Sequence, residues 1–129
     1  MVCTTCRLGP DRREDEAGRR GGALLHQALA DALPGHPAEA LGLSIREMAC
    51  LFACSSHCTV HLRAPGRMGY LLGRFEPSET DARALLDYAA AYLRTGEGVV
   101  RFADWPAGVK GHFIARLPPE GRVWRDGSP

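Results

Sequence analysis

The five cysteines of this 129-residue chain fall into two short clusters. Cys3 and Cys6 form a Cys-x2-Cys pair near the start, and Cys50, Cys54 and Cys58 follow one another with three residues between each in the middle of the chain. Such spacings let two thiolates of one loop reach a single soft metal centre. The two clusters therefore predict a site built from thiolates.

Four of these thiols, Cys3, Cys6, Cys50 and Cys54, are enough for a tetrahedral metal ion such as zinc or for a 2Fe-2S cluster with two sulfurs on each iron. Spacing alone does not separate the two. We favour the cluster, because a domain of this length has its own hydrophobic core and gains less from a structural zinc ion. Cys58 is either a further ligand, able to replace one of the N-terminal pair, or a buried cysteine outside the site.

Thiol–disulfide exchange is the competing chemistry for a Cys-x-x-Cys pair. In that chemistry the first cysteine lies at a helix N-terminus, whereas a charged segment with Gly and Pro, residues 7–20, follows Cys6. The chain has no glycine-rich phosphate loop, no nucleophile elbow, no His-Glu-x-x-His and no paired carboxylates in an apolar setting. We therefore expect a binding protein rather than an enzyme.

Composition narrows the class of protein further. A formal net charge of +1 gives no electrostatic case for nucleic acid, and no apolar run is long enough to cross a bilayer. The cysteine count is odd, and the first residues lack the pattern of a secretory signal. The sequence thus predicts a cytoplasmic protein with no nucleic-acid or membrane partner.

The hydrophobic pattern predicts the elements that hold the cysteines. A helix is expected over residues 22–33 and a longer one over 77–95, where Ser78 can cap the first turn. The other expected elements are strands: a clipped strand at 2–4, a strand at 41–45 from the alternation of Leu41, Leu43 and Ile45, and a hairpin formed by 59–63 and 68–72.

The element order β-α-β-β-β-α predicts a thioredoxin-like α/β sandwich. We assign residues 1–98 to this metal-binding domain. Residues 99–129 have no sustained hydrophobic period, so we expect an irregular C-terminal extension packed on the domain, with a disordered end from Pro118 onward.

Two stretches resemble the thioredoxin-like 2Fe-2S ferredoxins, which include the small subunit of respiratory complex I. They are Val-Cys-Thr-Thr at residues 2–5 and the Cys-x3-Cys loop of residues 50–54, which precedes the hairpin. The resemblance implies that Cys3, Cys6, Cys50 and Cys54 are the cluster ligands.

A closer resemblance is to a bacterial family of uncharacterised, predicted metal-binding proteins, often encoded beside cobalamin-synthesis and cobaltochelatase genes. Val-Cys-Thr-Thr-Cys-Arg at residues 2–7, Cys-Leu-x-x-Cys-x-x-x-Cys-Thr-Val at 50–60 and Arg-Leu-Pro-Pro at 116–119 carry it. It implies that Cys58 belongs to the metal-binding motif. The metal itself is left open by this resemblance.

We therefore expect a cysteine-ligated metal-binding protein, with a 2Fe-2S cluster that passes single electrons to a protein partner. The alternative is a zinc- or cobalt-binding carrier or accessory factor that passes metal to a partner in cobalamin or tetrapyrrole metallation. The sequence is compatible with a homodimer.

Overall fold

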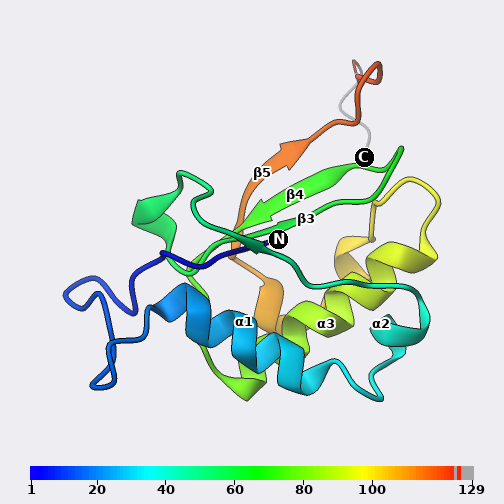
Figure 1. Cartoon of the computed structure of the whole chain (residues 1–129). Coiled ribbons are helices and arrows are strands. Elements are labelled where there is room, and N and C mark those ends of the chain that lie inside the picture. The colour runs from blue at the N-terminus through cyan, green and yellow to red at the C-terminus, as the bar shows by residue number, and fades with distance from the viewer. Residues whose placement is uncertain (124, 126–129) are drawn as a thin grey trace.

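A five-stranded mixed sheet forms the centre of the molecule (Figure 1). The computed structural model describes residues 1–123 and 125. The strands lie in the order β2-β1-β3-β4-β5, in which β1 and β2 are parallel and the other neighbours are antiparallel. Their bounds are Val2–Cys3 for β1, Glu47–Met48 for β2, Val60–Leu62 for β3, Gly69–Leu72 for β4 and Phe113–Leu117 for β5.

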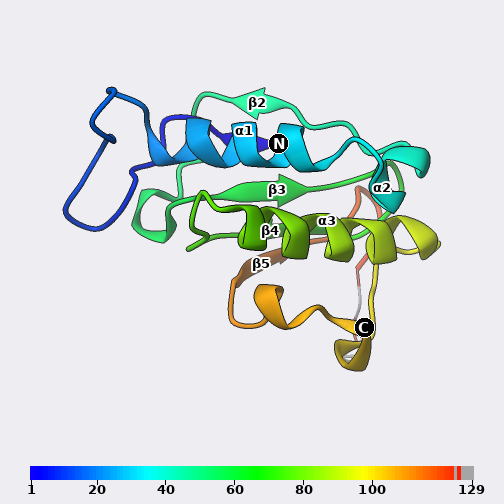
Figure 2. The same ribbon diagram turned by 90° about the horizontal axis from the view of Figure 1, so that it is seen from below.

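Helices α1 (Gly21–Ala32) and α3 (Glu79–Arg94) lie side by side on one face of the sheet (Figures 1 and 2). A short helix α2 (Pro37–Ala40) follows α1 and also packs on α3. The predicted cap of α3 is confirmed, because the Ser78 hydroxyl accepts a hydrogen bond from the Asp81 backbone N–H. No helix in the described part of the chain is long and apolar enough to cross a membrane.

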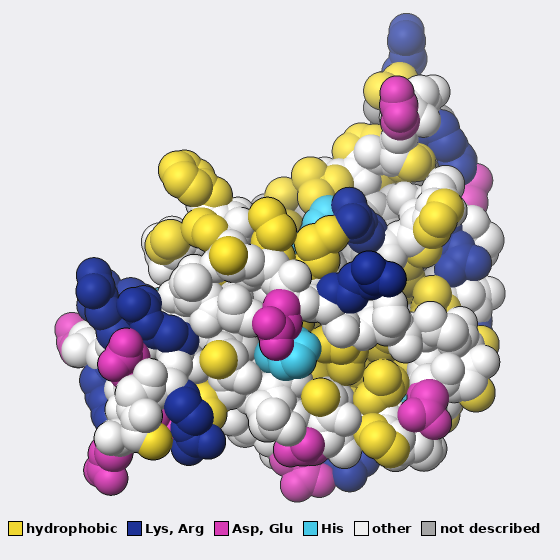
Figure 3. Space-filling view, viewed as in Figure 1, with side chains coloured by type: hydrophobic (Ala, Val, Ile, Leu, Met, Phe, Trp, Pro, Cys, Tyr) yellow, Lys and Arg dark blue, Asp and Glu magenta, His cyan; other side chains and the backbone are white. Residues whose placement is uncertain are grey.

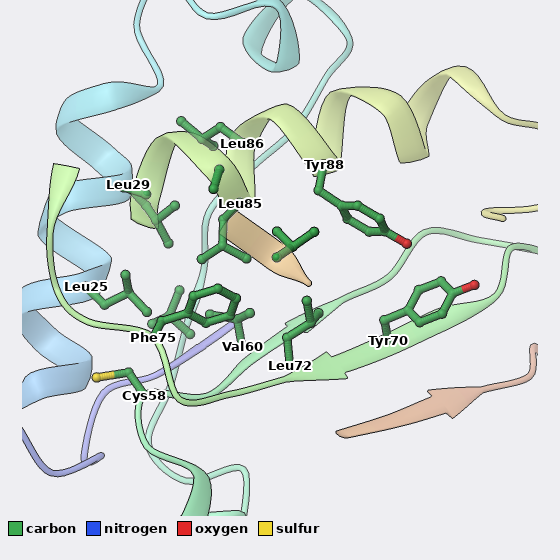
Figure 4. Packing of buried hydrophobic residues seen from close by; sticks show 14 of the residues in the cluster. Leu25, Leu29, Cys58, Val60, Tyr70, Leu72, Phe75, Leu85, Leu86 and Tyr88 are labelled. Carbon is green, nitrogen blue, oxygen red and sulfur yellow. The ribbon is translucent and has the colours of Figure 1, made fainter. Parts of the chain in front are cut away.

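The core fills the space between the helices and the sheet (Figure 4). Tyr70 of β4 makes edge-to-face contacts with Tyr88 and Tyr92 of α3, each with ring centroids 6.2 Å apart. The Tyr92 hydroxyl donates a hydrogen bond to the Met68 carbonyl at 2.5 Å, which satisfies its polar end inside the core. These aromatic contacts fix the hairpin to α3.

The predicted strand at residues 41–45 is wrong. Gly42 takes a φ of +91° in a turn directly after α2, and β2 begins only at Glu47. Leu43 and Ile45 still pack against the core. Their alternation therefore reflects burial of one side of an irregular segment rather than pairing in the sheet.

The expected irregular extension contains a strand. Residues Phe113–Leu117 form β5, which pairs with the edge of β4. The apolar residues of this region are isolated among Gly and Pro and show no alternating pattern. The strand therefore forms because it pairs with β4, not because its own sequence favours a strand. The sequence predicts a disordered end from Pro118 onward. Residues 118–123 follow β5 as turns and coil, and residues 124 and 126–129 lie outside the described residues.

The start of α1 lies directly against the backbone of the N-terminal cysteine pair. The Gly22 backbone N–H donates to the Cys6 carbonyl at 3.2 Å. A Cβ atom on Gly22 would lie 1.7 Å from the Cys3 carbonyl oxygen, and one on Gly21 would lie 2.3 Å from the Arg7 carbonyl oxygen. Only glycine permits this close approach of the helix to the turn between Cys3 and Cys6.

We predict that Gly22→Ala lowers the free energy of unfolding by about 1–3 kcal/mol or more, because the added methyl group overlaps a backbone atom that must then move. Urea unfolding of the two proteins measures the effect. The matched control is Gly9→Ala, where nothing lies within 4 Å of the new Cβ atom, with an expected change within about 0.5 kcal/mol. Equal stability of the Gly22 and Gly9 variants would contradict the close approach.

Candidate metal centre

The central position of β1 brings the two cysteine clusters together. In the parallel pair, Cys3 is opposite Met48, so it lies beside the segment that leads to Cys50. On the other side, the Cys3 backbone N–H donates to the Thr59 carbonyl at 3.0 Å, which places Cys3 next to Cys58. All five predicted cysteines therefore come from segments that meet at one end of the sheet.

The five thiols divide into an inner and an outer group. Cys3, Cys6 and Cys58 are buried, with exposed fractions of 3%, 4% and 0%. Cys50 and Cys54 are exposed, and all five are free thiols. The sequence left the role of Cys58 open, and the structure places it with the buried N-terminal pair, where its thiol donates to the Arg7 carbonyl at 3.7 Å.

The backbone of the Cys50–Cys54 loop points N–H groups at two sulfurs. The Leu51 N–H donates to Cys3 Sγ at 3.4 Å, and the Phe52 N–H donates to Cys50 Sγ at 3.3 Å. Burial opposes ionisation of Cys3, but hydrogen bonds from Leu51, Cys6 and Thr5 outweigh it and hold the pKa of Cys3 below its ordinary value. Hydrogen bonds of this kind stabilise charge on a thiolate ligand.

The other two buried thiols are held in their neutral form. Burial, with Cys3 as neighbour, raises the pKa of Cys6 to about 11, although hydrogen bonds from Thr59 act in the opposite direction. Burial, with the nearby Cys6 and Cys3, raises the pKa of Cys58 to about 12. A metal that takes these thiolates must therefore displace their protons, so binding would release protons to solvent.

Thr59 holds the loop that carries Cys54, and sequence reasoning missed it. Its side chain is fully buried, and its hydroxyl lies 3.0 Å from the Ser56 carbonyl and 3.3 Å from the Ala53 carbonyl. Ser56 also accepts a backbone hydrogen bond from Arg74 at 2.9 Å. The sequence around Thr59 does not indicate that it holds the loop, because the carbonyl groups that it contacts come close only when the loop folds back.

Five thiols are enough ligands, and of the right kind, for a soft metal, but their sulfur atoms do not surround one common position. Among the described residues, no three His, Cys, Asp or Glu side chains form a group that could hold a metal ion as they lie. The outer thiols are exposed, whereas the inner three are buried, and the outer pair lies on a loop where Phe52 has a φ of +61° and is 94% exposed. Joint ligation by inner and outer thiols thus requires this loop to turn inward.

We predict that Thr59→Val frees the loop at residues 53–56, because two part-buried carbonyl groups lose their hydroxyl donor and keep only a backbone donor, at a cost of about 0.5–1.5 kcal/mol in the free energy of unfolding. Reaction of the metal-free protein with a thiol reagent should then label the inner cysteines faster than in the wild type. Thr59→Ser keeps the hydroxyl and serves as the control, with labelling rates close to wild type. Identical labelling of the Val and Ser variants would show that the hydroxyl does not hold the loop.

Comparison with known proteins gives a family and no function. Residues 1–119 match the family described as a protein of unknown function, DUF1636. No curated protein and no solved structure matches the chain. Since the match covers both cysteine clusters and all five strands, the chain belongs to the DUF1636 family of proteins of unknown function.

Proposed function

We propose that this protein binds a metal centre through its cysteines, and that the centre is a 2Fe-2S cluster which carries single electrons. The observation that supports this most is the meeting of both cysteine clusters at one end of the sheet, through the pairing of β1 with β2 and its contact with Thr59. Backbone N–H groups directed at Cys3 and Cys50 add the hydrogen bonds that such sulfur ligands use.

Cys3 and Cys6 supply two ligands from the turn after β1, and Cys50 and Cys54 supply two from the loop. When bound, the cluster takes up and releases one electron. Leu51 is half-buried beside the core and excludes water from one side of the site, while Thr59 holds the base of the loop. Cys58, buried beside Cys3 and Cys6, is an exchange ligand in this proposal, which becomes the fourth ligand when one of the N-terminal pair is lost.

The fold that we propose is thioredoxin-like. The order β2-β1-β3-β4, with β1 parallel to β2 and the hairpin antiparallel, supports this arrangement with α1 and α3 on one face. The domain of residues 1–98 contains these elements. The C-terminal part extends the sheet by β5 and packs a short turn, Ala107–Val109, on α3.

The partner in this proposal is another cytoplasmic protein that exchanges an electron or a metal. Phe52 supports a contact of this kind, because a large apolar side chain that is 94% exposed stands on the same loop as the two exposed thiols. A partner that covers Phe52 would also cover Cys50 and Cys54.

The second candidate is a zinc- or cobalt-binding carrier or accessory factor for cobalamin or tetrapyrrole metallation. The division into three buried and two exposed thiols favours it, because an ion taken up by inner thiolates could be passed out through an outer one, once the inner thiols move closer together than they now lie. The sequence resemblance to proteins encoded beside cobalamin-synthesis genes points in the same direction. Both candidates use the same cysteines and differ in the metal.

We predict that protein purified without oxygen is brown and contains iron and acid-labile sulfide in equal amounts, because a 2Fe-2S cluster holds two of each. Metal and sulfide analysis with an absorption spectrum checks this. Protein without acid-labile sulfide that carries one zinc ion (colourless) or one cobalt ion (blue to green) per chain would favour the carrier instead. Protein that takes up none of these metals on reconstitution would overturn both candidates.

The ligand roles predict distinct losses in serine variants. Cys50→Ser and Cys54→Ser should each abolish the centre, because no other thiol belongs to that loop segment. Cys6→Ser should keep a centre with an altered spectrum, since Cys58 lies beside it, and the double variant Cys6→Ser with Cys58→Ser should lose it. Complete loss in Cys6→Ser alone, with Cys58→Ser unchanged, would remove Cys58 from the site.

A further inference from the structure

A hollow opens at the end of the sheet opposite to the thiols, where β1 begins and β3 ends. Its inner part lies between the sheet and the helices and has a cavity volume of about 60 Å³, and its outer part adds about 190 Å³. The walls are apolar, from Val2, Val60, Leu29, Leu85 and Ala89. The inner part is several times the size needed for one water molecule, so it admits a few methylene groups, and the rest of a ligand would lie in the outer part.

The outer part of the same hollow is cationic. It shares Met1, Leu43, His61 and other lining residues with the inner part, and it adds Arg46 and Arg63. None of the described residues that line either part is acidic. In Figure 3, dark-blue Lys and Arg side chains lie beside apolar surface near the middle of this face. An apolar floor thus ends in a basic rim.

The two arginines of the rim are not neutralised within the described part of the chain. The ion pairs found there involve other cations, and Glu47, next to Arg46 in the sequence, is paired with His26 at 3.4 Å. Burial and the neighbouring positive charges, Arg63 among them, lower the pKa of His61. The rim therefore carries a positive field that a bound anion would relieve.

We propose that this hollow is a binding site for a small organic anion with a short aliphatic tail, whose carboxylate lies at Arg46 and Arg63 and whose tail lies on Val60, Leu85 and Ala89. The charge of the rim selects an anion over a neutral or cationic ligand. The apolar walls select a tail over a bare inorganic anion. The site is separate from the cysteines, and the proposal does not depend on the metal.

Hexanoate tests the proposal on the full chain, with binding followed by NMR shifts of residues that line the hollow. We expect hexanoate to bind at least about tenfold more tightly than acetate, because its methylene groups leave water. Hexan-1-ol and hexylammonium have the same tail without the negative charge and should bind more weakly still. Equal affinity for hexanoate and hexan-1-ol, or no shift with hexanoate, would overturn the proposal.

Two charge-matched double variants separate the rim from the overall charge. Arg46→Gln with Arg63→Gln should weaken hexanoate binding by about tenfold, because the charged hydrogen bonds are lost. Arg12→Gln with Arg13→Gln removes the same charge from the exposed loop at the other end of the molecule and should leave binding unchanged. If both double variants bind hexanoate equally weakly, the effect comes from the net charge of the protein, and the proposed site is wrong.

Ala89→Leu tests the apolar part. The larger side chain extends into the hollow and should abolish hexanoate binding, and a thermal unfolding curve close to wild type shows that the fold is kept. If the Leu variant is folded and binds hexanoate as the wild type does, the tail does not lie in the hollow and the proposal fails. If the Ala89→Leu variant does not fold, the comparison of the two arginine double variants still tests the proposal. Arg46 and Arg63 are exposed, so replacing them should leave the fold intact.

Discussion

The position of β1 is the constraint on which the rest of the structure depends. This strand has only two residues, yet it pairs with β2 on one side and β3 on the other. Its own hydrogen bonds are too few to hold it, so it relies on the two glycines of α1 that let the helix pack directly on the turn after it. Sheet, helix and cysteine turn are therefore stable together or not at all.

Burial of three thiols beside one another has an electrostatic consequence. The pKa values of Cys6 and Cys58 are raised by burial, whereas hydrogen bonds from the loop and from neighbouring side chains lower that of Cys3. Cys3 therefore ionises more readily than an ordinary cysteine, whereas Cys6 and Cys58 stay protonated. In the site we propose, the metal supplies the positive charge that makes ionisation of all three favourable.

The two ends of the central strands differ in chemistry. At one end, thiols and backbone N–H groups gather under a loop with an exposed aromatic residue, Phe52. At the other, an apolar hollow carries arginines that lack acidic partners among its lining residues. The core between them is continuous from Cys58 through Val60 and Leu72 to Tyr70 (Figure 4). Both ends therefore depend on the same packed layer.

Local patterns in the sequence determined α1, α3 with its Ser78 cap, the β3–β4 hairpin and the two cysteine clusters, because each depends on residues close together in the chain. The strand β5, the true start of β2 at Glu47 and the separation of buried Cys58 from exposed Cys50 were decided only by the tertiary structure. The same holds for Thr59 and Gly22, whose roles come from carbonyl groups that the fold places against them. Strand edges and close backbone contacts are pairings between distant segments, and no periodicity within either segment encodes them.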